Sequence, residues 1–390
     1  MEPKPDVVVH LVHGTWPFGP FSKSSGPTKA WFEVGSAVLA KIEEVHGHKI
    51  HFEEFHWSGK NAFFERMNAA VKFSQRLTEA IGQWAESKHV IIAHSHGGMV
   101  AAQALAKLSL SADEKDRIKA LICLATPFVY LSPLNKPRQD LLFFGALGFI
   151  CAALLIVLLQ SLFGLPYLLY LPLCLGAPIF FAGILFLLRA DPPLEYFAPL
   201  STRPGIPTFL IRGTRDEASL VIGLAQILHL VADAFYRSWE EGPTHRSLIE
   251  TALWTGAYVF VLVAGAVITK SLGEDPFSPW ALPSIFVFGS ASLSCLYVAG
   301  YALLAVSAGL VNPRHWPAVI EVDSAPPNKE CSIKSYFDLS KIEQKTLRHG
   351  IYELPEVQAD LATLIQAVED GITPSFENAL KQSRSRPVHA

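Results

Sequence analysis

The stretch HVIIAHSHGGMVAAQAL, residues 89–105, sets a serine between two histidines and in front of two glycines. The apolar run at His89–Ala93 predicts a buried strand, and a helix is expected from about Gly98. Between them, the sequence predicts a sharp turn with the Ser95 hydroxyl at its apex. A serine on such a turn holds its Oγ above the sheet, at the positive end of the following helix. The spacing therefore favours a nucleophilic serine.

Small residues stand two positions before and two positions after this serine, at Ala93 and Gly97. The pattern differs from G-x-S-x-G by one methyl group, and a small side chain is what lets the strand and helix approach each other. The backbone N–H of His96 can point at an oxyanion. The side chains of His94 and His96 lie too close to the serine in sequence to act as its base. We expect them to line the pocket or to pack against the sheet.

A serine hydroxyl is a weak nucleophile and needs a base that a carboxylate orients. In FLIRGTRDE, Asp216 follows a predicted strand, with Glu217 beside it as a second candidate carboxylate. In TLRHGIYELPEV, His349 stands between the last predicted strand and the last predicted helix. Three other histidines also follow Asp216 and remain competing candidates for the base: His229, His245 and His315.

A second polar turn follows the first predicted strand, in LVHGTWPFGPF. His13, Gly14 and Thr15 predict a sharp turn whose backbone can come close to a substrate oxygen. A second oxyanion donor would then be the N–H of Thr15 or of Trp16. The simpler alternative is a turn that only ends a strand.

Short apolar strands alternate with helices in the charged part of the chain. Strands are expected at Asp6–Val12, Ile50–Phe55, His89–Ala93, Ala120–Ala125, Pro207–Arg212, Ala318–Val322 and Ser332–Asp338, and helices at Ala30–Glu44, Ala62–Ser87 and Pro355–Glu369. The alternation predicts an α/β fold with a mostly parallel sheet flanked by helices. Active residues collect at the carboxyl ends of such strands, where each of these polar clusters stands.

The chain is 50% hydrophobic and only 17% charged. Residues 141–188, 251–269 and 276–313 contain no charged residue and no histidine. A helix crosses a bilayer with roughly 20 apolar residues. Four spanning helices are therefore expected, at about 141–162, 167–188, 250–269 and 282–310. An apolar cap, or hairpins that enter the membrane only shallowly, is the alternative.

Lysine and arginine flank the outer ends of these segments, at Lys136, Arg138, Arg189, Arg237, Arg246 and Arg314. The two connecting loops carry one lysine between them, Lys270. The positive-inside rule then places the catalytic part on the cytoplasmic side of an integral membrane protein. The N-terminal residues show no signal peptide.

Several function classes find no support in composition. The five cysteines show neither metal spacing nor a disulfide framework, which suits reduced thiols. The net charge of −3 gives no argument for nucleic acid. His46, His48, His51 and His56 straddle a loop and a strand without acids at ligand spacing, so neither a metal nor another cofactor is expected.

Four motifs together resemble the α/β-hydrolase superfamily, specifically its lipases and esterases: HGT, AHSHGG, GTRDE and RHGIYELPEV. The order Ser…Asp…His is the one this superfamily uses. The resemblance implies that Ser95 is the nucleophile, His349 the general base and acid, and Asp216 its orienting carboxylate. The implied oxyanion hole comprises His96, Thr15 and Trp16.

The resemblance covers the globular residues, and the apolar segments lie outside its pattern. The hydrolase core would comprise residues 1–140, 190–246 and 313–390, with the acid loop and an amphipathic interfacial helix at 219–239 in its middle part. Transmembrane hairpins would interrupt it at 141–189 and 247–312. The second hairpin would separate Asp216 from His349, a less usual place for an insertion in this superfamily.

The expected activity is hydrolysis of lipid-like carboxylic esters through an acyl-enzyme, because both hairpins are expected to leave the catalytic face of the sheet. The substrate would be a phospholipid, a lysophospholipid or an acylglycerol, and the bilayer itself the main partner. An acyl-protein thioesterase or an acyltransferase would use the same triad. A non-catalytic membrane scaffold is the remaining alternative, and the oligomeric state stays open.

Overall fold

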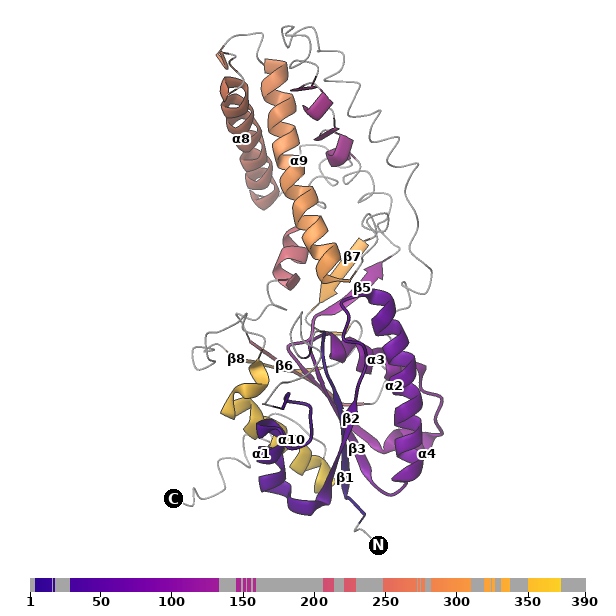
Figure 1. Ribbon diagram of the computed structural model, residues 1–390. Helices are drawn as coiled ribbons and strands as arrows, with labels where there is room; N and C mark the ends of the chain where they lie inside the picture. The colour runs from indigo at the N-terminus through magenta and orange to yellow at the C-terminus, as the bar shows by residue number, and fades with distance from the viewer. Residues whose placement is uncertain are drawn as a thin grey trace. The chain divides into compact units, whose positions relative to one another are not determined.

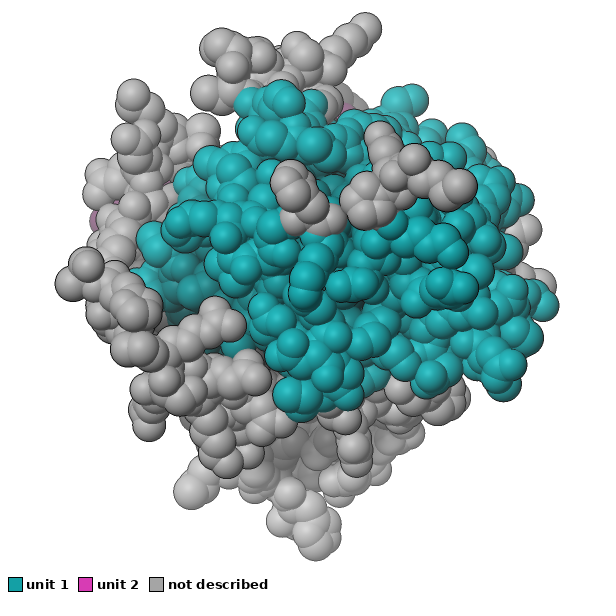
Figure 2. All heavy atoms as spheres, turned by 90° about the horizontal axis from the view of Figure 1, so that it is seen from below, with its two compact units in different colours: residues 1–130, 198–223, 322–390 teal, residues 131–197, 224–321 magenta. Residues whose placement is uncertain are grey.

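The computed structural model describes residues 4–15, 17, 29–132, 206–213, 221–228, 248–271, 273, 275–277, 282–309, 319–323, 325–326, 331–336 and 350–372, with short helical pieces between 145 and 158. The chain forms two compact units, the first made of residues 1–130, 198–223 and 322–390 and the second of 131–197 and 224–321. The three stretches of unit 1 come together as one body, drawn in teal in Figure 2.

A six-stranded parallel sheet forms the centre of unit 1 (Figure 1). Its strands stand in the order β2 (Ile50–Phe55), β1 (Val7–Val12), β3 (Lys88–His94), β4 (Ile118–Leu124), β6 (Thr208–Gly213) and β8 (Ser332–Tyr336). Every neighbouring pair in this sheet is parallel. The predicted α/β class with a parallel sheet is confirmed.

The strand expected at Ala318–Val322 forms as β7 (Val319–Asp323), but it lies outside this sheet. It pairs with β5 (Phe128–Ser132), a strand not expected from the sequence, in a separate two-stranded sheet. Strand propensity is local, whereas the choice of partner depends on which other backbone is left unpaired nearby. The place of this strand therefore corrects the prediction.

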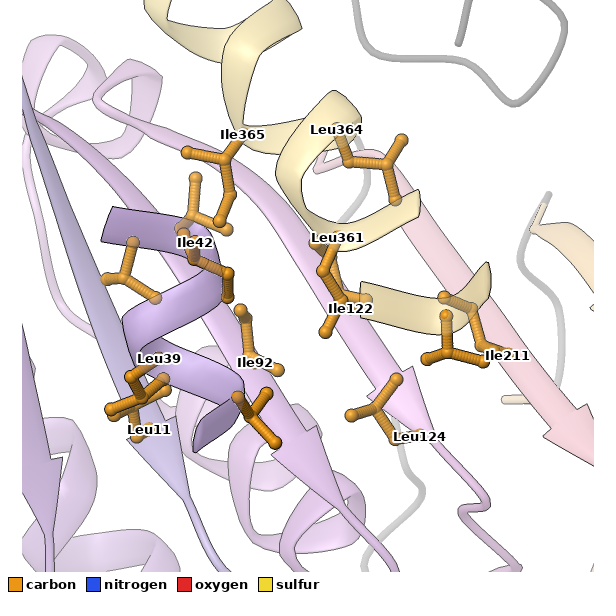
Figure 3. Close-up of a cluster of buried hydrophobic side chains, with 14 of the residues drawn as sticks. Leu11, Leu39, Ile42, Ile92, Ile122, Leu124, Ile211, Leu361, Leu364 and Ile365 are labelled. Atoms are coloured by element: carbon orange, nitrogen blue, oxygen red, sulfur yellow. The ribbon is translucent and has the colours of Figure 1, made fainter. Parts of the chain in front are cut away.

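Helices cover both faces of the parallel sheet. Helices α1 (Ala37–His46) and α10 (Pro355–Glu369) pack against each other over one face, and α2 (Phe63–Gln83) and α3 (His96–Lys107) over the other. Strand side chains alternate between faces. Leu11, Ile92, Ile122 and Ile211 thus meet Leu39, Ile42, Leu361 and Ile365 in one apolar core, shown in Figure 3.

The first helix starts seven residues later than the predicted Ala30. Gly35 has φ +84°, a left-handed conformation, and Ser36 next to it caps the helix by accepting the N–H of Leu39. The Ser36 hydroxyl also donates to the backbone oxygen of Trp31 at 2.7 Å, which holds the preceding turn in place. Residues 30–35 therefore approach the sheet as turns and not as helix.

Helices α8 (Leu248–Ser271) and α9 (Leu282–Ser307) of unit 2 run side by side in opposite directions (Figure 1). A Cβ on Gly265 would lie 1.9 Å from the backbone oxygen of Ile285, and a Cβ on Gly289 equally close to that of Val261. The two backbones thus touch at both glycines, a close approach that small residues allow.

Within the part of the chain that the structure describes, one helix is long and apolar enough to cross a membrane, Phe288–Ser307. Gly256–Ser271 is apolar as well but shorter. The predicted segment at 167–188 lies outside the described residues, and the one at 141–162 is described only as short helical pieces between 145 and 158. The expectation of four spanning helices is therefore not confirmed.

Candidate active site

Ser95 occupies the sharp turn between β3 and α3, as the sequence predicts. Its backbone has φ +54° and ψ −136°, a conformation that residues with a side chain seldom adopt. Such a conformation costs about 1–3 kcal/mol and persists only where surrounding contacts hold it. Here the Ser95 backbone N–H donates to the backbone oxygen of Leu124 at 2.8 Å, and the Ser95 backbone oxygen accepts the Gly98 N–H at 3.0 Å. The fold holds a strained serine at the carboxyl end of β3.

The Ser95 hydroxyl does not cap the helix that follows it. A serine in this position ordinarily accepts an N–H of the first helical turn, and two others in this chain do so. Ser36 accepts from Leu39, and Ser111 accepts from Glu114. At the unusual backbone angles of Ser95, its hydroxyl thus makes no cap hydrogen bond to α3.

Two glycines allow the turn after β1 to rest against Ser95. A Cβ on Gly14 would lie 2.6 Å from the Ser95 Cβ, and a Cβ on Gly97 would lie 2.5 Å from the backbone oxygens of Val12 and His13. Real Cβ atoms do not come this close to other atoms, so both positions need glycine. The HGT turn and the serine turn, about eighty residues apart in sequence, are therefore one packed unit.

His13 is buried and hydrogen-bonded through both ring nitrogens. Its Nε2 accepts the backbone N–H of Trp57 at 3.3 Å, so Nδ1 carries the hydrogen and donates to the Gly14 oxygen at 2.8 Å. Burial lowers the pKa of His13 to about 4, although the hydrogen bond to the Gly14 oxygen acts in the opposite direction. A neutral histidine held in this way is a structural support of the turn, and it cannot serve as the base for Ser95.

His94 packs among aromatic rings. Its ring meets that of Tyr352 edge-on, with 5.0 Å between centroids, and that of Trp31 at 5.9 Å. Trp31 and Tyr352 stack on each other at 5.5 Å. Burial raises the pKa of Tyr352 to about 12, so its hydroxyl stays protonated. The segment that starts at Gly350 thus lies against the residue preceding Ser95.

The structure brings together six of the predicted site residues: His13, Gly14, His94, Ser95, His96 and Gly97. Thr15 is described directly after Gly14 and is partly buried. The remaining candidates lie outside the described residues: Trp16, Asp216, His349, Glu217, His229, His245 and His315. Their described neighbours are Gly213 at the end of β6 and Gly350 ahead of α10.

No group of histidine, cysteine or acidic residues in the described part of the chain could hold a metal ion. Three of the histidines considered in the sequence have carboxylate partners. His46 bonds to Glu369 at 3.1 Å, His51 to Glu53 at 3.1 Å and His56 to Glu54 at 2.8 Å. Glu369 also pairs with Lys49, so that cluster joins α10 to the end of α1.

Trp31, Trp57 and Tyr352 were not predicted as part of the site. Trp57 stands two residues after β2, which is the neighbour of β1 in the sheet. Because parallel strands end at the same edge, a residue just after β2 lies close to the turn after β1. That signal could have found Trp57, but it requires knowing that β1 and β2 are neighbours.

No family model matches the chain, and no curated protein matches its sequence. Among solved structures, the chain is similar to a Trichoderma reesei cutinase in complex with a C11Y4 phosphonate inhibitor. The two are 17% identical over 32% of this chain and 53% of the cutinase, with a TM-score of 0.25. The matched part spans about half of the cutinase, and a likeness of this size carries no argument about activity.

Proposed function

We propose that this chain is a serine hydrolase that cleaves carboxylic esters through an acyl-enzyme. The observation that carries the proposal is the strained, buried Ser95, whose hydroxyl does not cap its own helix. Natural proteins keep such strain where it serves a function, and here it presents an oxygen at the N-terminus of α3. The helix dipole at that end stabilises negative charge, which develops as an ester carbonyl is attacked.

Asp216 and His349 complete the proposed triad. Asp216 comes three residues after Gly213, the last residue of β6, which is two strands away from β3 with β4 between them. His349 comes directly before the segment whose Tyr352 packs on His94. Asp216 thus follows a strand that ends at the serine edge of the sheet, and His349 adjoins a segment that packs against the residue preceding Ser95. In this triad His349 takes the Ser95 proton and returns it to the leaving group, and Asp216 orients the imidazole.

The oxyanion hole would use two backbone N–H groups. His96 is the first residue of α3, where N–H groups point out of the helix end. The second donor is the N–H of Thr15 or Trp16, in the turn that Gly14 brings against Ser95. Losing one such donor typically lowers the rate about 100- to 1000-fold.

The proposed substrates are lipid-like esters, and the support lies in α8 and α9. Buried positions on α8 recur every fourth residue, at Val261, Gly265 and Thr269, along one stripe. Between Gly256 and Ile268 the remaining residues are apolar, and Val263 and Val267 are 59% and 63% exposed. A helix that is apolar all round needs an apolar environment. We propose that the bilayer supplies it, with the catalytic part on the cytoplasmic side and phospholipid, lysophospholipid or acylglycerol as substrate.

The first test is labelling with a fluorophosphonate, which reacts only with an activated serine. Membranes that carry the wild type, Ser95→Ala or His349→Ala should show a labelled band of the correct size for the wild type alone. Ser111→Ala is the matched control, because that serine only caps a helix, and it should label like the wild type. A folded wild type that does not label, or label retained in Ser95→Ala, would refute the proposal.

The membrane part has its own test. Full-length protein should stay in the membrane pellet after an alkaline carbonate wash, since apolar helices inserted in lipid are not removed by charge or pH. Release into the supernatant would contradict the lipid-embedded arrangement. Ester, thioester and acyl-transfer assays on the labelled enzyme then distinguish the hydrolase from a thioesterase or an acyltransferase.

A further inference from the structure

We propose that Trp57 is a positioning residue that clamps the candidate oxyanion turn in place, an inference that rests on the proposed function. The indole Nε1–H of Trp57 donates to the backbone oxygen of His13 at 2.8 Å. The backbone N–H of the same residue donates to the His13 ring. Trp57 therefore holds both the main chain and the side chain of His13, the residue that begins the HGT turn.

Ring packing fixes the His13 side chain between the same elements. Trp57 stacks on it nearly parallel, with 5.5 Å between ring centroids and an angle of 11°. Phe32 covers it at 4.7 Å. Gly59, with φ +60°, brings the loop close enough that a Cβ there would lie 2.7 Å from Pro17. The imidazole is thus packed between the rings of Trp57 and Phe32.

The clamp determines where the Thr15 N–H points. His13 Nδ1–H holds the Gly14 oxygen at 2.8 Å. In a trans peptide the C=O and the N–H point in opposite directions, so fixing the Gly14 oxygen also fixes the Thr15 N–H. The His13 oxygen, held by the indole, lies on the side where Gly97 makes its close approach. Trp57 thus acts on the candidate donor Thr15 through His13, without touching substrate.

This arrangement contributes through preorganisation. A donor aimed before the reaction needs no reorientation when charge develops on the substrate oxygen. Removing the indole hydrogen bond makes the His13 backbone more mobile, so the Thr15 N–H is no longer held in one direction. This should weaken stabilisation of the transition state more than binding of the substrate. The expected effect is a fall in kcat with KM little changed.

The variant to test is Trp57→Phe, which keeps an aromatic ring and removes the Nε1–H donor. Trp84→Phe is the matched control, because the Trp84 indole N–H is buried and has no hydrogen-bond partner among the described residues. For full-length protein in detergent micelles, Trp57→Phe should lower kcat and the fluorophosphonate labelling rate about tenfold and leave KM within about twofold. The pH midpoint of labelling should stay unchanged, because the proposed base is not altered. Trp84→Phe should behave like the wild type.

A second pair of variants tests the turn without depending on the folding of Trp57→Phe. His13→Asn supplies a side-chain N–H in place of Nδ1–H, whereas His13→Leu supplies none. His13→Asn should therefore label faster than His13→Leu at similar thermal stability.

The outcomes separate the clamp from the proposed activity. A wild type that labels at Ser95, with Trp57→Phe equally fast, would overturn the clamp and leave the hydrolase proposal standing. Equal labelling of His13→Asn and His13→Leu would overturn it too. A wild type that does not label would refute the hydrolase proposal and with it the basis of the clamp.

Discussion

Replacing Gly97 by alanine should disable the site by forcing two turns apart. The added Cβ would lie 2.5 Å from the backbone oxygens of Val12 and His13. Both oxygens belong to the end of β1 and the turn that follows it, so neither can move out of the way by a change of rotamer. The strain must instead be relieved by a shift of the α3 start relative to the HGT turn.

The size of that shift follows from the contact distance. An ordinary carbon–oxygen contact is about 3.3 Å, so the two turns must separate by about 0.8 Å. A displacement near 1 Å of catalytic groups costs about 100-fold in rate. Overpacking a well-packed interior costs about 1–3 kcal/mol of stability. We therefore expect a clear loss of fluorophosphonate labelling together with a moderate fall in Tm.

The matched control is Gly82→Ala in α2, where a Cβ would meet no atom within 4 Å. It should label like the wild type and be as stable or slightly more stable, because alanine favours the helix by up to about 1 kcal/mol. Labelling rates and thermal unfolding of the three proteins give the comparison. If Gly97→Ala labelled at the wild-type rate with an unchanged Tm, the close packing of the two turns would be wrong.

Three further predictions concern stability. His10 Nε2 and His89 Nδ1 lie 2.9 Å apart in the sheet, and burial lowers the pKa of both, that of His89 to about 4. Between about pH 6.5 and pH 4 the unfolded chain binds more protons than the folded chain. The free energy of unfolding therefore decreases as the pH is lowered, by about 3 kcal/mol for a shift of this size. The double variant His10→Leu/His89→Leu removes this pair and keeps its electrostatic neighbours, His51, Arg76, Arg117 and Glu53. Urea unfolding at pH 7.5 and pH 5 should therefore show a smaller loss of stability for the variant than for the wild type. An equal loss in both proteins would contradict the role of the histidine pair. Glu369→Gln should cost about 1 kcal/mol, because burial of this carboxyl raises its pKa but hydrogen bonds from Lys49 and His46 outweigh that and stabilise the charge; Glu44→Gln, at an exposed pair with Lys41, is the neutral control. Gly265→Val should lower the Tm in detergent because its Cβ meets the Ile285 backbone, whereas Gly256→Val, with open space around it, should not, and similar Tm values would argue against the close α8–α9 contact.

The elements of unit 1 could be predicted closely because their signals are local. Ile50–Phe55 and Pro355–Glu369 form with the predicted bounds, one from a short strand pattern and the other from apolar residues at helical spacing with Pro355 at the start. The start of α1 could not be predicted, since it depends on the Ser36 cap and its bond to Trp31. Apolar spacing alone continues through residues 30–36 and does not show where the chain turns.

By itself, the sequence determined the serine turn, the α/β class and the apolar segments, because turn residues, period-two strands and long uncharged runs are read from neighbouring positions. Only the tertiary structure decided which turns meet. The approach of Gly14 to Ser95 and the hydrogen bond from Trp57 to His13 depend on the strand order β2-β1-β3. The pairing of β7 with β5, outside the main sheet, was likewise decided by the tertiary structure. Such contacts join residues far apart along the chain, and their energies arise only once the backbone has been brought together, which no local pattern encodes.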